Sequence, residues 1–248
     1  MKYAICMPAY NEASGLAEFL TEITAAFEGS DFHIFVIDDC STDSTSSVLA
    51  EMRREELPVT YRSRVENLGH GPSTVEALEL ALAHDPEFVI AVDGDGQFKG
   101  PDLMSFGSAL ATSNVDVLEG VRIARQDPLF RRITSLATRI LVFSRCGQFP
   151  ADANTPVRGY RATALEVILP RLPTGAMTPN LFISVLARTL PLLVSQESIR
   201  CYPRRGVDAS GTTWKSKRHN LPSKRFLQFC GLATVQWLRQ TSRQYRHT

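Results

Sequence analysis

Two aspartates follow an apolar stretch of the chain at a spacing that suits a divalent cation. The run Val89–Val92 predicts a buried strand, and Asp93, Gly94 and Asp95 come directly after it. Side chains two positions apart in an extended segment share a face, and the glycine between them lets a ligand approach the backbone. Proteins typically hold Mg²⁺ or Mn²⁺ with one or two carboxylates, and substrate phosphates supply further ligands. The two aspartates therefore predict a metal-bridged diphosphate site, with a solvated acidic turn as the alternative.

Polar side chains also follow two other predicted strands. The strand at residues 3–8 leads into Tyr10 and Glu12, and the strand at 32–38 leads into Asp39. In an open parallel sheet the carboxyl ends of all strands face one crevice, where ligands bind. The coincidence of three polar strand ends favours a binding site over a solvated turn.

The alternation of strand-like and helix-like patterns predicts an α/β fold with a mainly parallel sheet. The expected strands lie near residues 3–8, 32–38, 58–63, 87–92 and 115–121. The expected helices lie near residues 14–28, 43–55, 72–84 and 101–112. No Gly-x-Gly-x-x-Gly follows the first strand, and the chain has no Walker lysine motif. These absences count against a dinucleotide oxidoreductase and against a P-loop enzyme.

Four short motifs occur together and in a fixed order within about the first 100 residues. They are Pro8-Ala9-Tyr10-Asn11-Glu12, Asp38-Asp39-Cys40-Ser41-Thr42-Asp43-Ser44-Thr45, Asn67-Leu68-Gly69-His70-Gly71 and Asp93-Gly94-Asp95-Gly96-Gln97. In this combination the chain resembles the family 2 glycosyltransferases, and within them the dolichol and polyprenyl phosphate mannosyltransferases. The resemblance implies a GT-A type nucleotide-diphospho-sugar transferase fold, in which helices flank a Rossmann-like, mainly parallel central sheet. It also implies one catalytic domain at 1–220, with the nucleotide-sugar half at 1–121 and the acceptor half at 122–220.

The resemblance assigns roles on the donor side of the site. Pro8, Tyr10 and Glu12 would line the nucleoside pocket, Tyr10 with a flat face for the base and Glu12 as an acceptor for hydroxyl or base N–H groups. The other implied contacts are Asp39 with the base, Asp93 with the nucleotide and the metal, Asp95 and Gln97 with the metal, and Arg205 near the diphosphate. The metal, Mg²⁺ or Mn²⁺, would neutralise the departing nucleoside diphosphate, which is otherwise a poor leaving group.

A second set of residues resembles the segment with which the lipid phosphate enzymes hold the acceptor phosphate. Arg122, Arg131 and Ser135 carry this likeness. Arginine suits the task because its planar donors fork onto phosphate oxygens. On a helix, Arg131 and Ser135 share a face, and a surface helix with solvated arginines is the alternative. Asp95, Arg122 and Arg131 are the predicted catalytic residues.

No obvious general base accompanies these residues. Where many family members have an acid, the helix expected at 179–188 offers Asn180 and Ser184, and Asp152 lies farther ahead of Gly159 than the family's usual acid. A sugar hydroxyl must lose a proton as it attacks, whereas a phosphate monoester arrives already anionic. The missing base therefore agrees with a lipid phosphate acceptor, and it would also agree with a degenerate enzyme.

The C-terminal part of the chain is strongly basic. Residues 198–248 contain 11 Lys and Arg residues and one acid, Asp208, although the whole chain has a formal net charge of only +1. A basic amphipathic helix is expected at 221–248, with Phe226 and Trp237 on its apolar stripe. Two environments suit such a helix: a membrane interface, or packing of the stripe on the domain or on a second subunit.

Cysteine usage and the start of the chain indicate a cytoplasmic location. Five cysteines without paired spacing predict reduced thiols. Met1-Lys2-Tyr3 leads directly into a strand and leaves no room for a signal peptide. No apolar run reaches the ~18–20 residues of a membrane span. We expect a cytoplasmic protein, at the cytoplasmic face of a membrane if the basic tail contacts lipid, and no nucleic acid partner.

These features predict a metal-dependent, inverting transferase that moves a hexose from a GDP- or UDP-sugar to an acceptor. Polyprenyl or dolichyl phosphate is the leading acceptor, and inversion is implied by the family likeness. Transfer to a saccharide or other hydroxyl is the alternative, and a nucleotide-sugar-binding protein without turnover is a further one. A nucleotidyltransferase ranks last, because residues 9–15 lack the basic loop that a triphosphate would need.

Overall fold

A computed structural model describes residues 1–123, 129–206 and 224–240. The strands are β1 (Tyr3–Ala9), β2 (Phe32–Asp38), β3 (Val59–Ser63), β4 (Phe88–Ala91), β5 (Val117–Ile123), β6 (Arg158–Arg161) and β7 (Val194–Arg200). The helices are α1 (Ala13–Ala26), α2 (Thr45–Arg54), α3 (His70–Leu82), α4 (Gly100–Thr112), α5 (Leu129–Cys146), α6 (Ala162–Ile168), α7 (Pro179–Thr189) and α8 (Lys224–Arg239), with a short 3₁₀ turn at Leu169–Arg171. Every strand and helix expected in the first half is present, and its ends lie within two residues of the expected ones.

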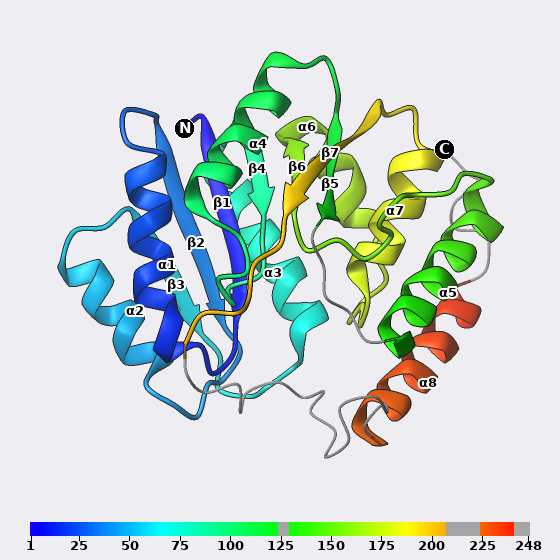
Figure 1. The fold of residues 1–248 in the computed structure, drawn as a ribbon, viewed down its shortest axis with the longest axis horizontal. Coiled ribbons are helices and arrows are strands. Elements are labelled where there is room, and N and C mark those ends of the chain that lie inside the picture. Colours follow the sequence, from blue (N-terminus) through cyan, green and yellow to red (C-terminus); the bar gives the residue numbers. More distant parts are fainter. Residues whose placement is uncertain (124–128, 207–223, 241–248) are drawn as a thin grey trace.

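The described strands form one mixed sheet in the order β3-β2-β1-β4-β6-β5-β7 (Figure 1). Neighbouring strands are parallel except at β6, which pairs antiparallel with both β4 and β5. The expected α/β class and mainly parallel sheet are therefore confirmed. β6 was not expected as a strand, because its four residues are too few for a pattern to be recognised.

Helices cover both faces of the sheet, as β1 illustrates. Its odd-numbered residues, such as Ile5, join a core with α1, α2 and α4. Its even-numbered residues, such as Cys6, join a second core with α3, α6 and α7. Side chains of a strand alternate between faces, so a strand covered on both sides must be apolar throughout. The residues of β1 are accordingly all buried.

A third apolar cluster joins α5, α7 and α8 beside the sheet (Figure 1). Trp237 of α8 is 3% exposed, and its ring centroid lies 5.1 Å from that of Phe182 on α7. Gln236 accepts a hydrogen bond from the N–H of Met177 at 2.9 Å, and Arg145 of α5 donates to the carbonyl of Trp237. Part of the C-terminal helix therefore packs on the protein. The rest of the helix expected at 221–248 lies outside the described residues. None of the helices that the structure describes combines the length and hydropathy needed to cross a bilayer.

Candidate functional site

The carboxyl ends of β1, β2 and β4 meet at one edge of the sheet, as the sequence predicts. The N–H of Gly94 donates to the carbonyl of Pro8 at 3.2 Å, and the N–H of Asp39 donates to the carbonyl of Ala9 at 2.9 Å. A Cβ on Gly94 would lie 2.7 Å from the Pro8 oxygen, so this close approach requires glycine. Pro8 itself is buried within β1, and Tyr10 is half-buried where the strand ends. The three polar loops thus share one site.

Asn11 ties the loop after β1 to the loop after β2. Its side-chain oxygen accepts from the N–H of Thr42 at 2.8 Å, and its own N–H donates to Oγ of Ser41 at 2.9 Å. The N–H of Glu12 donates to Oγ1 of Thr45 at 2.9 Å. Asn11 has a φ of +55°, a left-handed conformation that asparagine tolerates better than most residues. These bonds fix the backbone of Glu12, a positioning role that the sequence analysis did not assign.

Asp39, expected to bind the base, is largely occupied by the protein's own loop. Its carboxylate accepts from the N–H groups of Leu68 at 3.0 Å and Gly69 at 2.8 Å, and from Arg64 at 3.2 Å. Gly69 has a φ of +92°, a left-handed conformation that glycine adopts without a steric cost. A carboxylate oxygen can accept two hydrogen bonds. Oδ2 of Asp39 accepts one from Gly69, so it can accept a second one from a ligand. The role of Asp39 toward the base stays a prediction.

Three carboxylates act on one another at the strand ends. Burial, followed by the charge of Asp93, raises the pKa of Asp95 to about 6. Burial also raises the pKa of Glu12 to about 7, against the opposing effect of an ion pair with Arg204. Nε2 of His70 lies 3.5 Å from Oδ1 of Asp93. The site therefore concentrates negative charge, and the described residues that act against it include Arg204, beside Glu12 and Asp95, and Arg122, on which the charge of Asp93 acts.

Asp93 and Asp95 fit a divalent cation in their chemistry. The raised pKa of Asp95 means that its carboxylate lacks full compensation, and a cation would supply it. Within residues 1–123, 129–206 and 224–240, no three His, Cys, Asp or Glu side chains gather as a metal cage. A cation here would take further ligands from substrate phosphates and water. Gln97, the third expected ligand, donates its side-chain N–H to the carbonyl of Tyr202 at 3.3 Å, so it also has a structural contact.

A segment after β7, Cys201–Gly206, crosses the site, and we call it the strap. Figure 1 shows it running from β7 toward the first turn of α1, where Gly206 lies against Ser14. The N–H of Tyr202 donates to the carbonyl of Gln97 at 2.9 Å, and the N–H of Arg205 donates to the carbonyl of Asp95 at 3.2 Å. The strap is therefore bonded to the loop that carries the two aspartates.

The two adjacent arginines of the strap point to different partners. Arg205 donates to Glu18 at 2.8 Å, to the carbonyl of Gly96 at 3.2 Å, and to Glu22. Arg204 instead forms an ion pair with Glu12. The side chain of Arg205, which the sequence analysis places near the diphosphate, is bonded to α1, whereas Arg204 is directed to the carboxylates. The role of Arg205 toward the diphosphate stays a prediction. The basic pair was visible in the sequence, whereas the choice between its members depends on contacts with a distant helix.

Arg122, expected to hold the acceptor phosphate, lies at the end of β5 and forms a two-bond ion pair with Asp152. Its Nε and Nη2 donate to Asp152 at 2.6 and 3.0 Å, and the charge of Asp93 also acts on it. Arg122 is therefore close enough to Asp93 to be affected by its charge, and its role toward an acceptor phosphate stays a prediction. Ser135 is half-buried on α5. Arg131 lies on the same helix, but its side chain is outside the described residues.

The helix that lacks the family's usual acid instead contacts a buried glutamate from β5. Glu119 is 1% exposed and pairs with Arg188 at 2.5 Å and Arg158 at 3.4 Å. Arg158 also donates to Ser184 at 2.5 Å and to the side chain of Asn180 at 3.1 Å. Burial would raise the pKa of Glu119, but the two arginines outweigh it and hold the pKa below its ordinary value. Glu119 is thus a fixed counter-charge and is unsuited to act as a base.

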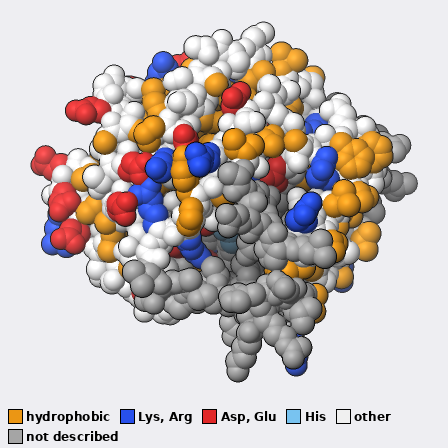
Figure 2. Space-filling view, viewed as in Figure 1, with side chains coloured by type: hydrophobic (Ala, Val, Ile, Leu, Met, Phe, Trp, Pro, Cys, Tyr) orange, Lys and Arg blue, Asp and Glu red, His pale blue; other side chains and the backbone are white. Residues whose placement is uncertain are grey.

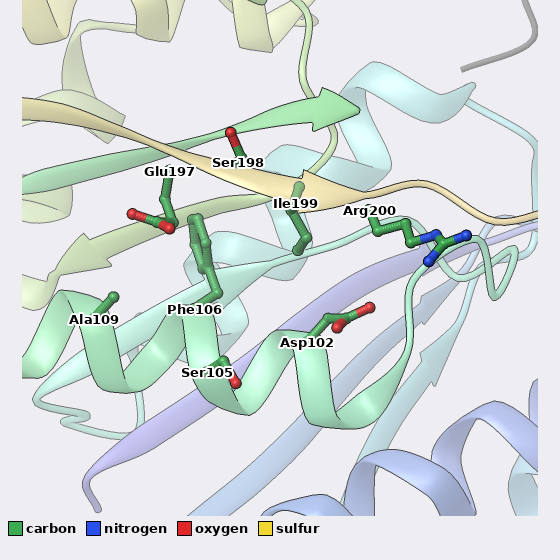
Figure 3. A pocket seen from close by; sticks show the side chains of 8 residues that line it. All are labelled: Asp102, Ser105, Phe106, Ala109, Glu197, Ser198, Ile199 and Arg200. Atoms are coloured by element: carbon green, nitrogen blue, oxygen red, sulfur yellow. The ribbon is translucent and has the colours of Figure 1, made fainter. Parts of the chain in front are cut away.

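A separate hollow lies between α4 and β7 (Figure 3). It is lined by Asp102, Ser105, Phe106, Ala109, Glu197, Ser198, Ile199 and Arg200. Arg200 also lies over the ring of Tyr202 in the strap, with 5.3 Å from Cζ to the ring centroid. The hollow therefore borders the root of the strap and contains none of the predicted site residues.

The chain matches the model of one protein family and resembles named bacterial enzymes. Residues 4–165 match the model described as Glycosyl transferase family 2. An undecaprenyl-phosphate 4-deoxy-4-formamido-L-arabinose transferase of Pseudomonas fluorescens is 30% identical over 194 residues, covering 77% of this chain and 56% of the relative. The enzyme of the same name from Enterobacter sp. is 29% identical over 192 residues, covering 76% and 56%. The chain thus spans about half the length of these curated relatives.

Solved structures share the fold. A mannosyltransferase from Pyrobaculum calidifontis, in complex with GDP-Man and Mn²⁺, aligns with a TM-score of 0.57 at 20% identity, covering 85% of this chain and 58% of that one. Glucosyl-3-phosphoglycerate synthase from Mycobacterium tuberculosis, in complex with Mn²⁺ and UDP-glucose, aligns with a TM-score of 0.61 at 18% identity, covering 84% and 73%. The predicted GT-A type fold is therefore confirmed.

Proposed function

This chain belongs to glycosyl transferase family 2, and on that premise we propose that it transfers a hexose from a GDP- or UDP-sugar to a polyprenyl phosphate, with inversion. The carboxylates at the carboxyl ends of β1 and β4 are the observation that carries this proposal. Asp93 and Asp95 would hold Mg²⁺ or Mn²⁺, which supplies charge neutralisation to the departing diphosphate. Glu12 and Tyr10 would contact the nucleoside, and Asp39 would accept from its base through Oδ2.

The proposed acceptor, a polyprenyl phosphate, rests on the side chains that could bind an incoming nucleophile. Arg122 would hold the incoming phosphate, joined by Arg131 and Ser135 from α5. Asp152 forms an ion pair with Arg122, and an incoming phosphate would exchange for that carboxylate. A phosphate monoester needs no general base, which suits a site where Glu119 is locked in ion pairs. The curated relatives are named for undecaprenyl phosphate, which supports the same class of acceptor.

A transfer assay tests this function. The chain is incubated with Mn²⁺, a panel of GDP- and UDP-sugars, and either undecaprenyl phosphate or a saccharide. We expect sugar to enter the lipid fraction with one of the donors. Arg122→Gln should raise the KM for the lipid phosphate about tenfold or more, because a charge-assisted bidentate contact is lost, with a smaller change for the donor. Transfer to the saccharide alone would refute the lipid acceptor, and donor binding without turnover would refute the transferase.

We also propose a peripheral membrane contact through α8, extended by α5. α8 exposes Leu227, Leu232, Val235 and Leu238. It begins at the basic Lys224 and ends at the basic Arg239. α5 exposes Ile133, Leu136, Ile140 and Phe143, which lie along one side of a helix. Figure 2 shows apolar side chains with Lys and Arg among them on the side of the molecule where α5 lies. An apolar stripe bordered by basic groups suits the surface of an anionic bilayer.

Vesicle sedimentation tests this contact. Vesicles that contain an anionic phospholipid should carry the chain into the pellet, and the Leu136→Glu, Ile140→Glu double variant should reduce the bound fraction at least about fivefold, because each glutamate must remain hydrated. Leu193→Glu, at a comparably exposed apolar residue before β7, is the matched control and should bind like the unaltered chain. Equal loss in both variants would contradict the assignment of the contact to α5.

A further inference from the structure

Arg204 is a cation that the protein itself places beside Glu12 and Asp95. Its guanidinium pairs with Glu12 and its charge acts on Asp95. Asp95 is one of the two residues proposed to hold a divalent cation. The positive charge of Arg204 therefore stands close to where a second, larger positive charge would bind.

The strap keeps Arg204 at this position whichever partner its side chain takes. The next residue, Arg205, is bonded through its N–H to the carbonyl of Asp95 and through its side chain to Glu18 and Glu22. Arg205 also packs closely on two glycines. A Cβ added to Gly15 would lie 2.6 Å from Cβ of Arg205, and one added to Gly96 would lie 2.6 Å from its Cδ. Arg204 has no such clamp on α1, and its side chain is 26% exposed. Arg205 is thus the anchor, and Arg204 is the member of the pair that can exchange partners.

We propose that Arg204 is an internal counter-ion that makes binding of the divalent cation and binding of the nucleoside diphosphate depend on each other. This inference rests on the proposed function. Without a diphosphate, the guanidinium remains with Glu12 and repels a cation that approaches Asp93 and Asp95. A diphosphate brings negative oxygens to which Arg204 can turn, so the repulsion is replaced by an attraction. By linkage, the diphosphate and the cation must then raise each other's affinity by the same factor.

In this scheme the site binds the divalent cation weakly when the donor is absent and tightly when the donor is bound. A protein built this way does not hold the metal as a permanent part of its structure. Glu12 gains a second function in this scheme, because it holds Arg204 while the donor is absent. Arginine suits the exchange because the same planar donor set matches both carboxylate and phosphate oxygens.

The test is a Mn²⁺ titration followed by the electron paramagnetic resonance signal of free Mn²⁺, with and without GDP or UDP. We compare the unaltered chain with Arg204→Gln, Arg204→Lys and Arg200→Gln under identical nucleotide concentrations, so that Mn²⁺ binding to free nucleotide is the same in every arm. In the absence of nucleotide, Arg204→Gln should bind Mn²⁺ about tenfold more tightly than the unaltered chain. The factor by which GDP or UDP raises the Mn²⁺ affinity should be about tenfold smaller in this variant. Arg204→Lys, which keeps the charge, should retain most of the coupling. Arg200→Gln should retain it as well, because Arg200 lies beside the hollow between α4 and β7 and over the ring of Tyr202, and we place it at neither the cation nor the donor.

The outcomes separate this inference from the proposed function. If the unaltered chain gains Mn²⁺ affinity with GDP or UDP but Arg204→Gln shows the same gain, the counter-ion role is wrong and the donor site stands. If the unaltered chain binds no Mn²⁺ even with either nucleotide, the proposed donor site itself fails. Thermal unfolding of each variant verifies that it is folded at the titration temperature.

Discussion

Asp95→Asn is expected to reduce sugar transfer by on the order of a thousandfold without loss of the fold. The substitution removes the charge of a proposed cation ligand, and electrostatic stabilisation of a leaving group is worth about this much in comparable sites. Asparagine keeps the size of the side chain and its acceptor oxygen, so the N–H of Gln97, which donates to Asp95 at 3.1 Å, retains a partner. The assay is transfer at saturating donor and acceptor.

The same substitution should not lower stability. Burial and the neighbouring Asp93 raise the pKa of Asp95 to about 6. At neutral pH, ionisation of this carboxyl group therefore costs more free energy in the folded protein than in the unfolded chain. A raised carboxyl pKa opposes folding above the unfolded value, and removing the charge relieves that cost. Without metal, Asp95→Asn should therefore unfold at the same temperature as the unaltered chain or higher. Low activity together with a lowered unfolding temperature would contradict a specific metal role.

Asp102→Asn provides the matched control. Asp102 is half-buried, and it lies on α4 beside the hollow in Figure 3. It is not among the residues that we place at the cation or at the donor. We expect its transfer rate to stay within about twofold of the unaltered chain, because conservative changes away from a site are usually small in effect.

The strands and the convergence of their ends could be predicted because they depend on local patterns. The apolar runs before Asp39 and Asp93 mark buried strands, and a parallel arrangement brings their ends together whatever the loops do. Asp93 and Glu12 were therefore placed correctly at one edge of the sheet. The mutual electrostatic effects of the carboxylates then follow from that topology.

The choice between Arg204 and Arg205 could not be made from the sequence. Arg204 and Glu12 are 192 residues apart, and the direction of each arginine depends on how the strap packs on α1. The same holds for Glu119, whose partners Arg158 and Arg188 come from β6 and α7. Sequence patterns indicate which residues are buried, but pairing between distant charges depends on tertiary packing that a single sequence does not contain.

Glu119→Gln is expected to lower the free energy of unfolding by about 3–5 kcal/mol at neutral pH, since breaking a buried ion pair leaves an uncompensated charge. Glu119 faces Arg158 and Arg188, which are 1% and 5% exposed in their side chains. It also accepts from Gln196 at 3.2 Å. The glutamine amide can replace some hydrogen bonds but none of the charge. Urea unfolding followed by circular dichroism measures the effect.

The pH dependence of stability provides a second readout. The arginines hold the pKa of Glu119 below its ordinary value in the folded protein, so its contribution to stability is fully present above the unfolded pKa of about 4.5. That contribution is lost as the pH falls through the folded value. The difference in unfolding free energy between the unaltered chain and Glu119→Gln should therefore be constant from pH 7 to about pH 5.5 and should shrink in more acidic buffer.

Glu166→Gln is the control, because Glu166 is an exposed glutamate on α6 and its substitution should change stability by no more than about 0.5 kcal/mol. A loss for Glu119→Gln as small as that of the control would mean that the two arginines find other partners or water. A large loss that stays constant down to strongly acidic pH would mean that packing of the side chain, rather than its charge, stabilises the junction of β5, β6 and α7. Only a large loss that diminishes in acid supports Glu119 as the counter-charge that allows Arg158 and Arg188 to remain buried at this junction.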